Sequence, residues 1–198
     1  MKTLSIPILI TIFFFTACKS QSEKEIKKIS RTTIDTAKER SHKEKEKEIS
    51  NTETNLLAGL VERNLPIIDS TSFDNFGKSG IPDKGFLKQI KFDPRRKDAT
   101  NFRLNYKIPF SENFTAVVVT FQCGEHELFT TLITINKENK IIDKLVIAYD
   151  EIAESAFRKT SKIEKDKIVV KSSNWMSEPP VIESETYRID NSGKFKKM

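Results

Sequence analysis

The sequence predicts a mainly β fold: an antiparallel meander forming a strongly bent sheet or partial barrel of about seven strands, with a short N-terminal helix. Two observations support this prediction. After residue 85 the chain consists of short stretches rich in β-branched and aromatic residues, separated by brief polar turns. Turns this short leave no room for crossover helices, so consecutive strands must pair antiparallel. A closed eight-stranded barrel is the alternative architecture.

The domain is expected to begin with irregular structure. Residues 56–61 are mostly apolar and predict the short helix, and residues 65–68 predict an extended segment. Residues 69–85 are rich in Gly, Pro, Asn, Asp and Ser, which predicts a loop. We expect residues 86–92 to form the first strand, which would end at Asp93-Pro94.

The later strands are identified by their patterns. Residues 102–108 alternate apolar and polar, which indicates a strand with one wet face. Residues 115–123 are β-branched and apolar on both faces, so we expect them at the centre of the sheet. Asp190-Asn191-Ser192-Gly193 is a strong hairpin signal because Asn and Gly tolerate positive φ. The other candidate strands are 128–135, 141–149, 157–163, 168–171, 185–189 and 194–196.

The beginning of the chain has a different composition. Lys2 supplies a positive charge, residues 4–15 are mostly apolar, and Ala17 precedes Cys18. A basic start, a short apolar run and small residues are typical of a secretory signal peptide. The run is shorter than the roughly 20 apolar residues that cross a bilayer, which argues against the alternative, a retained membrane anchor. We therefore expect a signal peptide over residues 1–17.

Phe15-Thr16-Ala17-Cys18 resembles the lipobox of bacterial lipoproteins. Phe15 stands where Leu is usual, and Thr16 stands where Ala or Ser is usual. The resemblance implies that Cys18 is diacylated on sulfur, becomes the mature N-terminus and binds membrane lipid. Lys19 follows the cysteine where Asp would imply inner-membrane retention, so the resemblance implies a lipid anchor in the outer membrane of the cell envelope.

Residues 19–54 are dominated by Lys and Glu and contain no aromatic residue. Such a segment buries too little apolar surface to offset its ordering entropy. It predicts a flexible tether, and the alternative of a coiled coil lacks a sustained heptad. The expected organisation is a signal peptide (1–17), a lipidated cysteine with a charged tether (18–54) and a single β-rich domain (55–198).

Composition excludes some partners. The net charge is +6 and the pI is about 9.2, but Lys and Glu alternate and no nucleic-acid-binding motif stands out, so we expect no nucleic-acid partner. If Cys18 is acylated, Cys123 has no second cysteine to pair with. The domain should then be stabilised by its apolar core.

The densest polar cluster is Cys123-Gly124-Glu125-His126-Glu127. It suggests a metal site or a Cys–His nucleophile pair. However, side chains splay apart in a turn, a structural metal needs about four ligands, and catalysis needs a third orienting group. His42, the other histidine, belongs to the expected tether. We therefore expect a solvated turn with a half-buried Cys123, and neither catalytic residues, nor a metal, nor a cofactor.

Two further segments could bind a partner or a ligand. Trp175, the only tryptophan, is followed by Met176 in a loop that ends at Pro179-Pro180. The pair is a weak candidate for partner contact. The favoured interpretation is that Trp175 caps the open end of the bent sheet, because large aromatics are mostly buried. Gly77-Lys78-Ser79 is not a phosphate loop, since the glycine required upstream is missing.

Residues 132–143, together with Tyr187-Arg188-Ile189-Asp190 and Gly193-Lys194-Phe195, resemble segments of uncharacterised β-rich lipoproteins of Bacteroidetes type. The resemblance implies a β-rich fold and a location in the cell envelope, but no activity. The expected function is a non-enzymatic binding module in the envelope, whose partner is an envelope protein or a glycan. The alternative is a lipoprotein inhibitor or immunity protein against an envelope-directed toxin or lytic enzyme. A hydrolase, the least supported function, would depend on Cys123 or His126.

Replacing Cys18 with Ser should release the protein from the membrane. Each buried methylene contributes about 0.8 kcal/mol, and two or three acyl chains together hold a protein firmly. Fractionation of cells labelled with palmitate measures both the loss of label and the move to the soluble fraction. A Cys18→Ser chain that stays in the membrane fraction would refute the lipid anchor.

Overall fold

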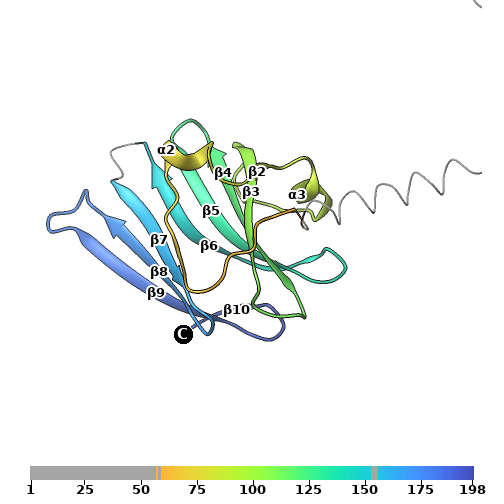
Figure 1. Ribbon diagram of the computed structural model, residues 1–198. Helices are drawn as coiled ribbons and strands as arrows, with labels where there is room; N and C mark the ends of the chain where they lie inside the picture. The colour runs from red at the N-terminus through yellow and green to blue at the C-terminus, as the bar shows by residue number, and fades with distance from the viewer. Residues whose placement is uncertain (1–56, 58, 153–155) are drawn as a thin grey trace, which may run out of the picture. The chain divides into compact units, whose positions relative to one another are not determined.

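The computed structural model describes residues 57, 59–152 and 156–198 (Figure 1). The predicted signal peptide, Cys18, the tether and His42 lie outside the described residues. In chain order the elements are β1 (Ile67–Asp69), α2 (Phe73–Phe76), β2 (Ile81–Pro82), α3 (Phe86–Gln89), β3 (Ala99–Ile108), β4 (Thr115–Cys123), β5 (Glu127–Ile135), β6 (Ile141–Glu151), β7 (Phe157–Ile163), β8 (Ile168–Asn174), β9 (Val181–Ile189) and β10 (Phe195–Lys197).

The described strands form one antiparallel sheet that is open and visibly curved (Figure 1). Strands β2 to β10 lie side by side in sequence order, and β1 pairs with β7. The mainly β class and the meander are confirmed. The expected count of about seven is wrong, because the sheet has ten strands. The surplus includes β1, which the sequence predicts only as an extended segment, and β2, whose two residues are too few for a pattern to reveal. The sheet does not close, so the alternative of a closed barrel is also wrong.

Strand β4 is buried on both faces, as its sequence predicts. Val117, Val119 and Phe121 belong to one apolar cluster, which we call the first cluster. Ala116 and Val118 point the other way and belong to the second cluster. Because β3 and β5 flank β4 along its length, the strand is central in its hydrogen bonding as well as in its burial.

Strand β3 differs from a simple strand with one wet face. Leu104 and Tyr106 are both buried, although they pack in the first and the second cluster respectively. A register shift between them, at Asn105, lets successive buried residues reach opposite faces of the sheet. The apolar residues alternate with polar ones as predicted. Because of the bulge, however, they are divided between both faces of the sheet and do not line a single face.

The prediction of a strand at 86–92 is wrong, because α3 occupies the start of this segment. The backbone N–H of Leu87 donates to the Asp83 carboxylate at 3.3 Å, which satisfies a group at the helix start. The buried residues have the spacing of one helix face, not of a strand, and they cover the first cluster: Phe86, Leu87 and Ile90.

The segment before α3 is also more structured than expected. Of the helix predicted at 56–61, Leu57 is helical, Leu56 and Ala58 lie outside the described residues, and the chain turns at Gly59 and Leu60. Of the extended segment predicted at 65–68, residues 67 and 68 belong to β1, whereas Leu65 and Pro66 form a bend. The predicted loop at 69–85 contains the short elements α2 and β2.

Strand β1 occupies a place where the sheet separates. Strands β6 and β7 pair at a single position, Tyr149 with Lys159. Farther along β7, β1 pairs with Ser161, Lys162 and Ile163. Ile67 of β1 thereby enters the second cluster, which contains residues of β3 to β8. The segment that carries β1 is thus anchored across one face of the sheet (Figure 1).

The turn between β9 and β10 gives a stability prediction. Gly193 has φ +84°, and an added Cβ would lie 3.0 Å from Ile142 and 3.1 Å from Phe114. Gly193→Ala should therefore lower the free energy of unfolding by about 1–2 kcal/mol, measured by urea denaturation. Gly77→Ala is the matched control, because Gly77 has φ −71° and open space around it. Equal stabilities of the two variants would contradict the prediction.

Candidate functional site

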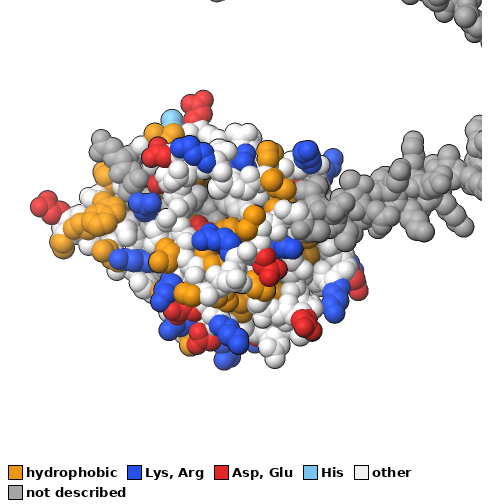
Figure 2. Space-filling model, viewed as in Figure 1, with side chains coloured by type: hydrophobic (Ala, Val, Ile, Leu, Met, Phe, Trp, Pro, Cys, Tyr) orange, Lys and Arg blue, Asp and Glu red, His pale blue; other side chains and the backbone are white. Residues whose placement is uncertain are grey.

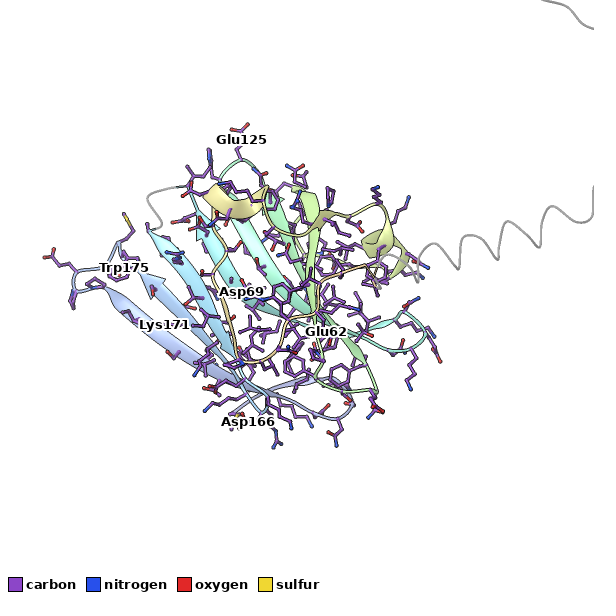
Figure 3. All side chains as sticks on the ribbon, viewed as in Figure 1. Glu62, Asp69, Glu125, Asp166, Lys171 and Trp175 are labelled. Atoms are coloured by element: carbon purple, nitrogen blue, oxygen red, sulfur yellow. The ribbon has the colours of Figure 1, made fainter. Side chains whose placement is uncertain are left out.

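The turn after β4 does not bring reactive groups into a site. Cys123 is 2% exposed and packs in the first cluster, so the expectation of a half-buried thiol is wrong. Its burial, aided by the nearby Asp98 carboxylate, raises the pKa of the thiol to about 11, which disfavours the nucleophilic thiolate. Glu125 and His126 belong to the exposed part of the turn (Figure 3).

Glu127 begins β5 and faces β6. The Tyr149 hydroxyl lies within hydrogen-bond distance of two carboxylates, Glu127 at 3.0 Å and Glu151 at 2.9 Å. Burial and these carboxylates raise the pKa of Tyr149, because both disfavour a phenolate. Among the described residues, no group of three or more His, Cys, Asp or Glu is arranged to hold a metal.

Trp175 and Met176 lie in the β8–β9 connection, at the far end of the hairpin (Figure 3). Their side chains are 56% and 73% exposed, so the favoured interpretation of Trp175 as a buried cap is wrong. The backbone explains the difference. The Trp175 N–H donates to the Ala156 carbonyl at 2.8 Å, and the Met176 N–H donates to the Asn174 side chain at 2.9 Å. These bonds hold the loop at the strand ends and leave the indole outside the core.

Neighbouring strands add apolar side chains beside this loop. In the ladder Asn174 pairs with Phe157 of β7 and with Val181 of β9. The five exposed residues, which we call the apolar tip, are Phe157, Trp175, Met176, Val181 and Ile182. Orange side chains gather at this end of the molecule in Figure 2. The sequence names Trp175 and Met176. Strand register brings Phe157 and Val181 to one face of this end of the sheet and Ile182 to the opposite face.

A cavity of about 530 Å³ adjoins the apolar tip. It shares Phe157 and Val181 with the tip and continues over Tyr149 and Phe129. Its charged lining residues have both signs: Arg96, Arg158, Lys159, Glu127 and Glu183. The region can therefore offer an apolar contact surface with ionic groups at its border, an arrangement typical of protein interfaces.

A second cavity, of about 350 Å³, is polar and lies between the β1 segment and the inner strands. The Tyr106 hydroxyl donates a short hydrogen bond to Asp69. The Asn105 amide donates to Thr120 at 2.6 Å, and the hydroxyls of Thr120 and Thr130 lie 2.7 Å apart. Tyr106, Thr120 and Thr130 are each at most 5% exposed. We call these five residues the polar network.

The polar network has a structural role that its contacts show. Asp69 ends β1, so its hydrogen bond with Tyr106 ties β1 to β3 (Figure 3). Burial raises the pKa of Asp69, and the opposing effects of the Tyr106 hydrogen bond and the Arg63 charge are smaller. The Arg63 guanidinium lies 4.7 Å from the centre of the Tyr106 ring. The hydrogen bond from Tyr106 to Asp69 and the contact of Arg63 with the Tyr106 ring secure the β1 segment over the sheet.

The polar network is not predicted from the sequence. Thr120 and Thr130 interrupt apolar strands, but threonine is common in strands. Asp69 begins a stretch with the composition of a loop, where an aspartate is ordinary. Only the pairing of β4 with β5, and of β1 with β7, brings these groups to one place.

No protein-family model, no curated protein and no solved structure matches this chain. In the part of the chain that the structure describes, the helices lack the length and the apolar character needed to cross a bilayer.

The raised pKa of Asp69 gives a pH prediction. Because the folded state binds this proton more tightly than the unfolded state, the Asp69 contribution favours folding below the unfolded pKa of about 3.8 and declines as pH rises above it. Asp69→Asn keeps an oxygen that accepts from Tyr106 and removes the titration. Urea unfolding from about pH 4 to about pH 7 should show a smaller loss of stability in Asp69→Asn than in the parent chain. Asp166→Asn, in the exposed β7–β8 turn, is the control. A parallel pH profile for Asp69→Asn and the parent would contradict this account.

Proposed function

We propose that the protein is an exported lipoprotein of the cell envelope that acts as a non-enzymatic binding module. Acylated Cys18 anchors it, the charged segment 18–54 tethers the β domain, and the apolar tip contacts a partner. The lipobox-like sequence supports the anchor, and the composition of residues 19–54 supports the tether.

The exposed apolar tip is the observation that carries the proposal. Its side chains are 45–73% exposed although all five are large and apolar. Leaving such a group in water forfeits about 25 cal/mol for every Å² of apolar surface that could be buried. An exposed apolar surface with charged groups at its border is typical of an interaction site. Tryptophan is moreover the residue type most enriched among binding hot spots.

The chemistry of the tip favours a protein partner over a glycan. Val181, Ile182 and Met176 present aliphatic or thioether groups that form no strong hydrogen bonds with sugar hydroxyls. Aromatic residues and methionine are enriched where proteins meet proteins. An inhibitor or immunity protein would use the same surface, and its captured partner would be a lytic enzyme or a toxin.

Truncating the two loop residues of the apolar tip should weaken retention of the partner. We expect the double variant Trp175→Ala with Met176→Ala to reduce recovery of the partner from solubilised envelope by at least about tenfold, because truncating a buried interface tryptophan costs about 2 kcal/mol or more. A photo-crosslinking amino acid at position 178, beside the tip, identifies the partner in the parent chain and measures its loss in the variant.

Ile68→Ala is the matched control, because Ile68 is 72% exposed and belongs to β1. It should keep the crosslink at the parental level. Equal recovery by the parent and the double variant would eliminate the apolar tip as the partner surface.

A further inference from the structure

The first half of β9 is an uncovered edge of the sheet. Strand β9 pairs with β8 from Val181 to Tyr187, whereas β10 covers its other side only from Tyr187 to Ile189. A hydrogen bond from the Met198 N–H to the Thr186 carbonyl, 2.9 Å long, extends that cover by one residue. Within the described chain, no strand pairs with the outer side of residues 181–185, which we call the open edge (Figure 1).

Backbone geometry decides which groups of the open edge lack a partner strand. In an antiparallel ladder, the N–H and C=O of one residue point to the same side, and those of the next residue point to the other side. The Thr186 carbonyl points toward β10. The backbone groups of Ile182 and Ser184 therefore point the same way, into the open side. The open edge presents two donors and two acceptors at the spacing of a β ladder.

Such an edge is a template for an added strand. Residues 181–184 are all exposed, and Ile182 offers an apolar side chain on one face. Glu183 would occupy a non-hydrogen-bonded position of the new ladder, where side chains of facing residues come closest. A lysine or arginine opposite Glu183 would be stabilising, and an acidic residue would be destabilising.

The same charge disfavours a second copy of this chain as the added strand. Two-fold pairing of open edges allows three short registers. One places Glu183 opposite its own copy, and another places Glu183 opposite Glu185 twice. The third register places Pro180, which has no N–H, opposite Ser184. Each of these registers therefore brings like charges together or loses a hydrogen bond. A strand from a different chain, with a basic residue opposite Glu183, fits the open edge better.

We infer that the partner held at the apolar tip adds an extended polypeptide segment to the open edge of β9, with a basic residue facing Glu183 and an apolar residue facing Ile182. This inference rests on the proposed function and deepens it. The added strand obtains affinity from the backbone of Ile182 and Ser184, and its sequence preference comes from Glu183. Trp175 and Met176 lie in the loop between β8 and β9, at the same end of the sheet as the open edge.

The test uses the full chain in detergent and a short synthetic peptide of alternating valine and lysine. Ser184→Pro removes one outward N–H and places a ring in the path of the added strand, a change that edge strands tolerate. It should weaken peptide binding at least about tenfold, measured by fluorescence anisotropy, since a lost hydrogen bond with a steric block exceeds 1.4 kcal/mol. Lys137→Pro is the control, because it places proline at the first central position of the exposed β5–β6 turn, where proline is favoured.

The inference further requires that a peptide of alternating valine and glutamate, and a valine–lysine peptide N-methylated at alternate residues, bind at least about tenfold more weakly. Hydrogen exchange of the parent chain should show peptide-dependent protection at Ile182 and Ser184, a readout that needs no variant. Unchanged binding by a folded Ser184→Pro chain, or no protection at these amides, overturns strand addition. If the parent binds no peptide yet keeps its Trp175-dependent crosslink, the inference fails while the proposed function stands.

Discussion

Strands β4 and β5 are buried on both faces, and this burial dictates how the other elements are arranged. Val117 and Val119 pack on one face of β4, and Ala116 and Val118 pack on the other. Each face therefore needs a cover. Helix α3 covers the first cluster, and the second is completed by β1 together with Ile163, Ile168 and Val170 of β7 and β8. Later strands of the sheet reach the face of earlier ones only if the sheet bends.

Strand β1 fills the place where β6 and β7 separate. There it pairs with β7 and carries Asp69 into the polar network. A buried carboxylate is tolerable because Tyr106 donates to it, and because burial raises its pKa toward the neutral form. The polar network thus secures the cover of the second cluster, and its polarity is explained by stability before any ligand is invoked.

An open sheet also has edges that a closed one lacks. Residues 61–63 and β2 lie against β3 at one side of the sheet, while β10 covers only the end of β9 at the other side. The uncovered part of β9 adjoins Trp175 and Met176, so backbone donors and large apolar side chains occur together. Because of this coincidence, the proposed binding function lies at the β8–β9 end and not at the buried Cys123.

Local signals in the sequence were enough to predict the β class, the meander and the position of β4, because β-branched runs and short turns act over a few residues. They also singled out Trp175 and Met176. The remaining features arise from contacts formed on folding. Residues 86–90 became a helix because their apolar side chains had a sheet face to cover. Phe157, Val181 and Ile182 joined the apolar tip through strand register, and Asp69 met Tyr106 across a bent sheet. These outcomes depend on contacts between residues distant in the chain, which local patterns do not encode.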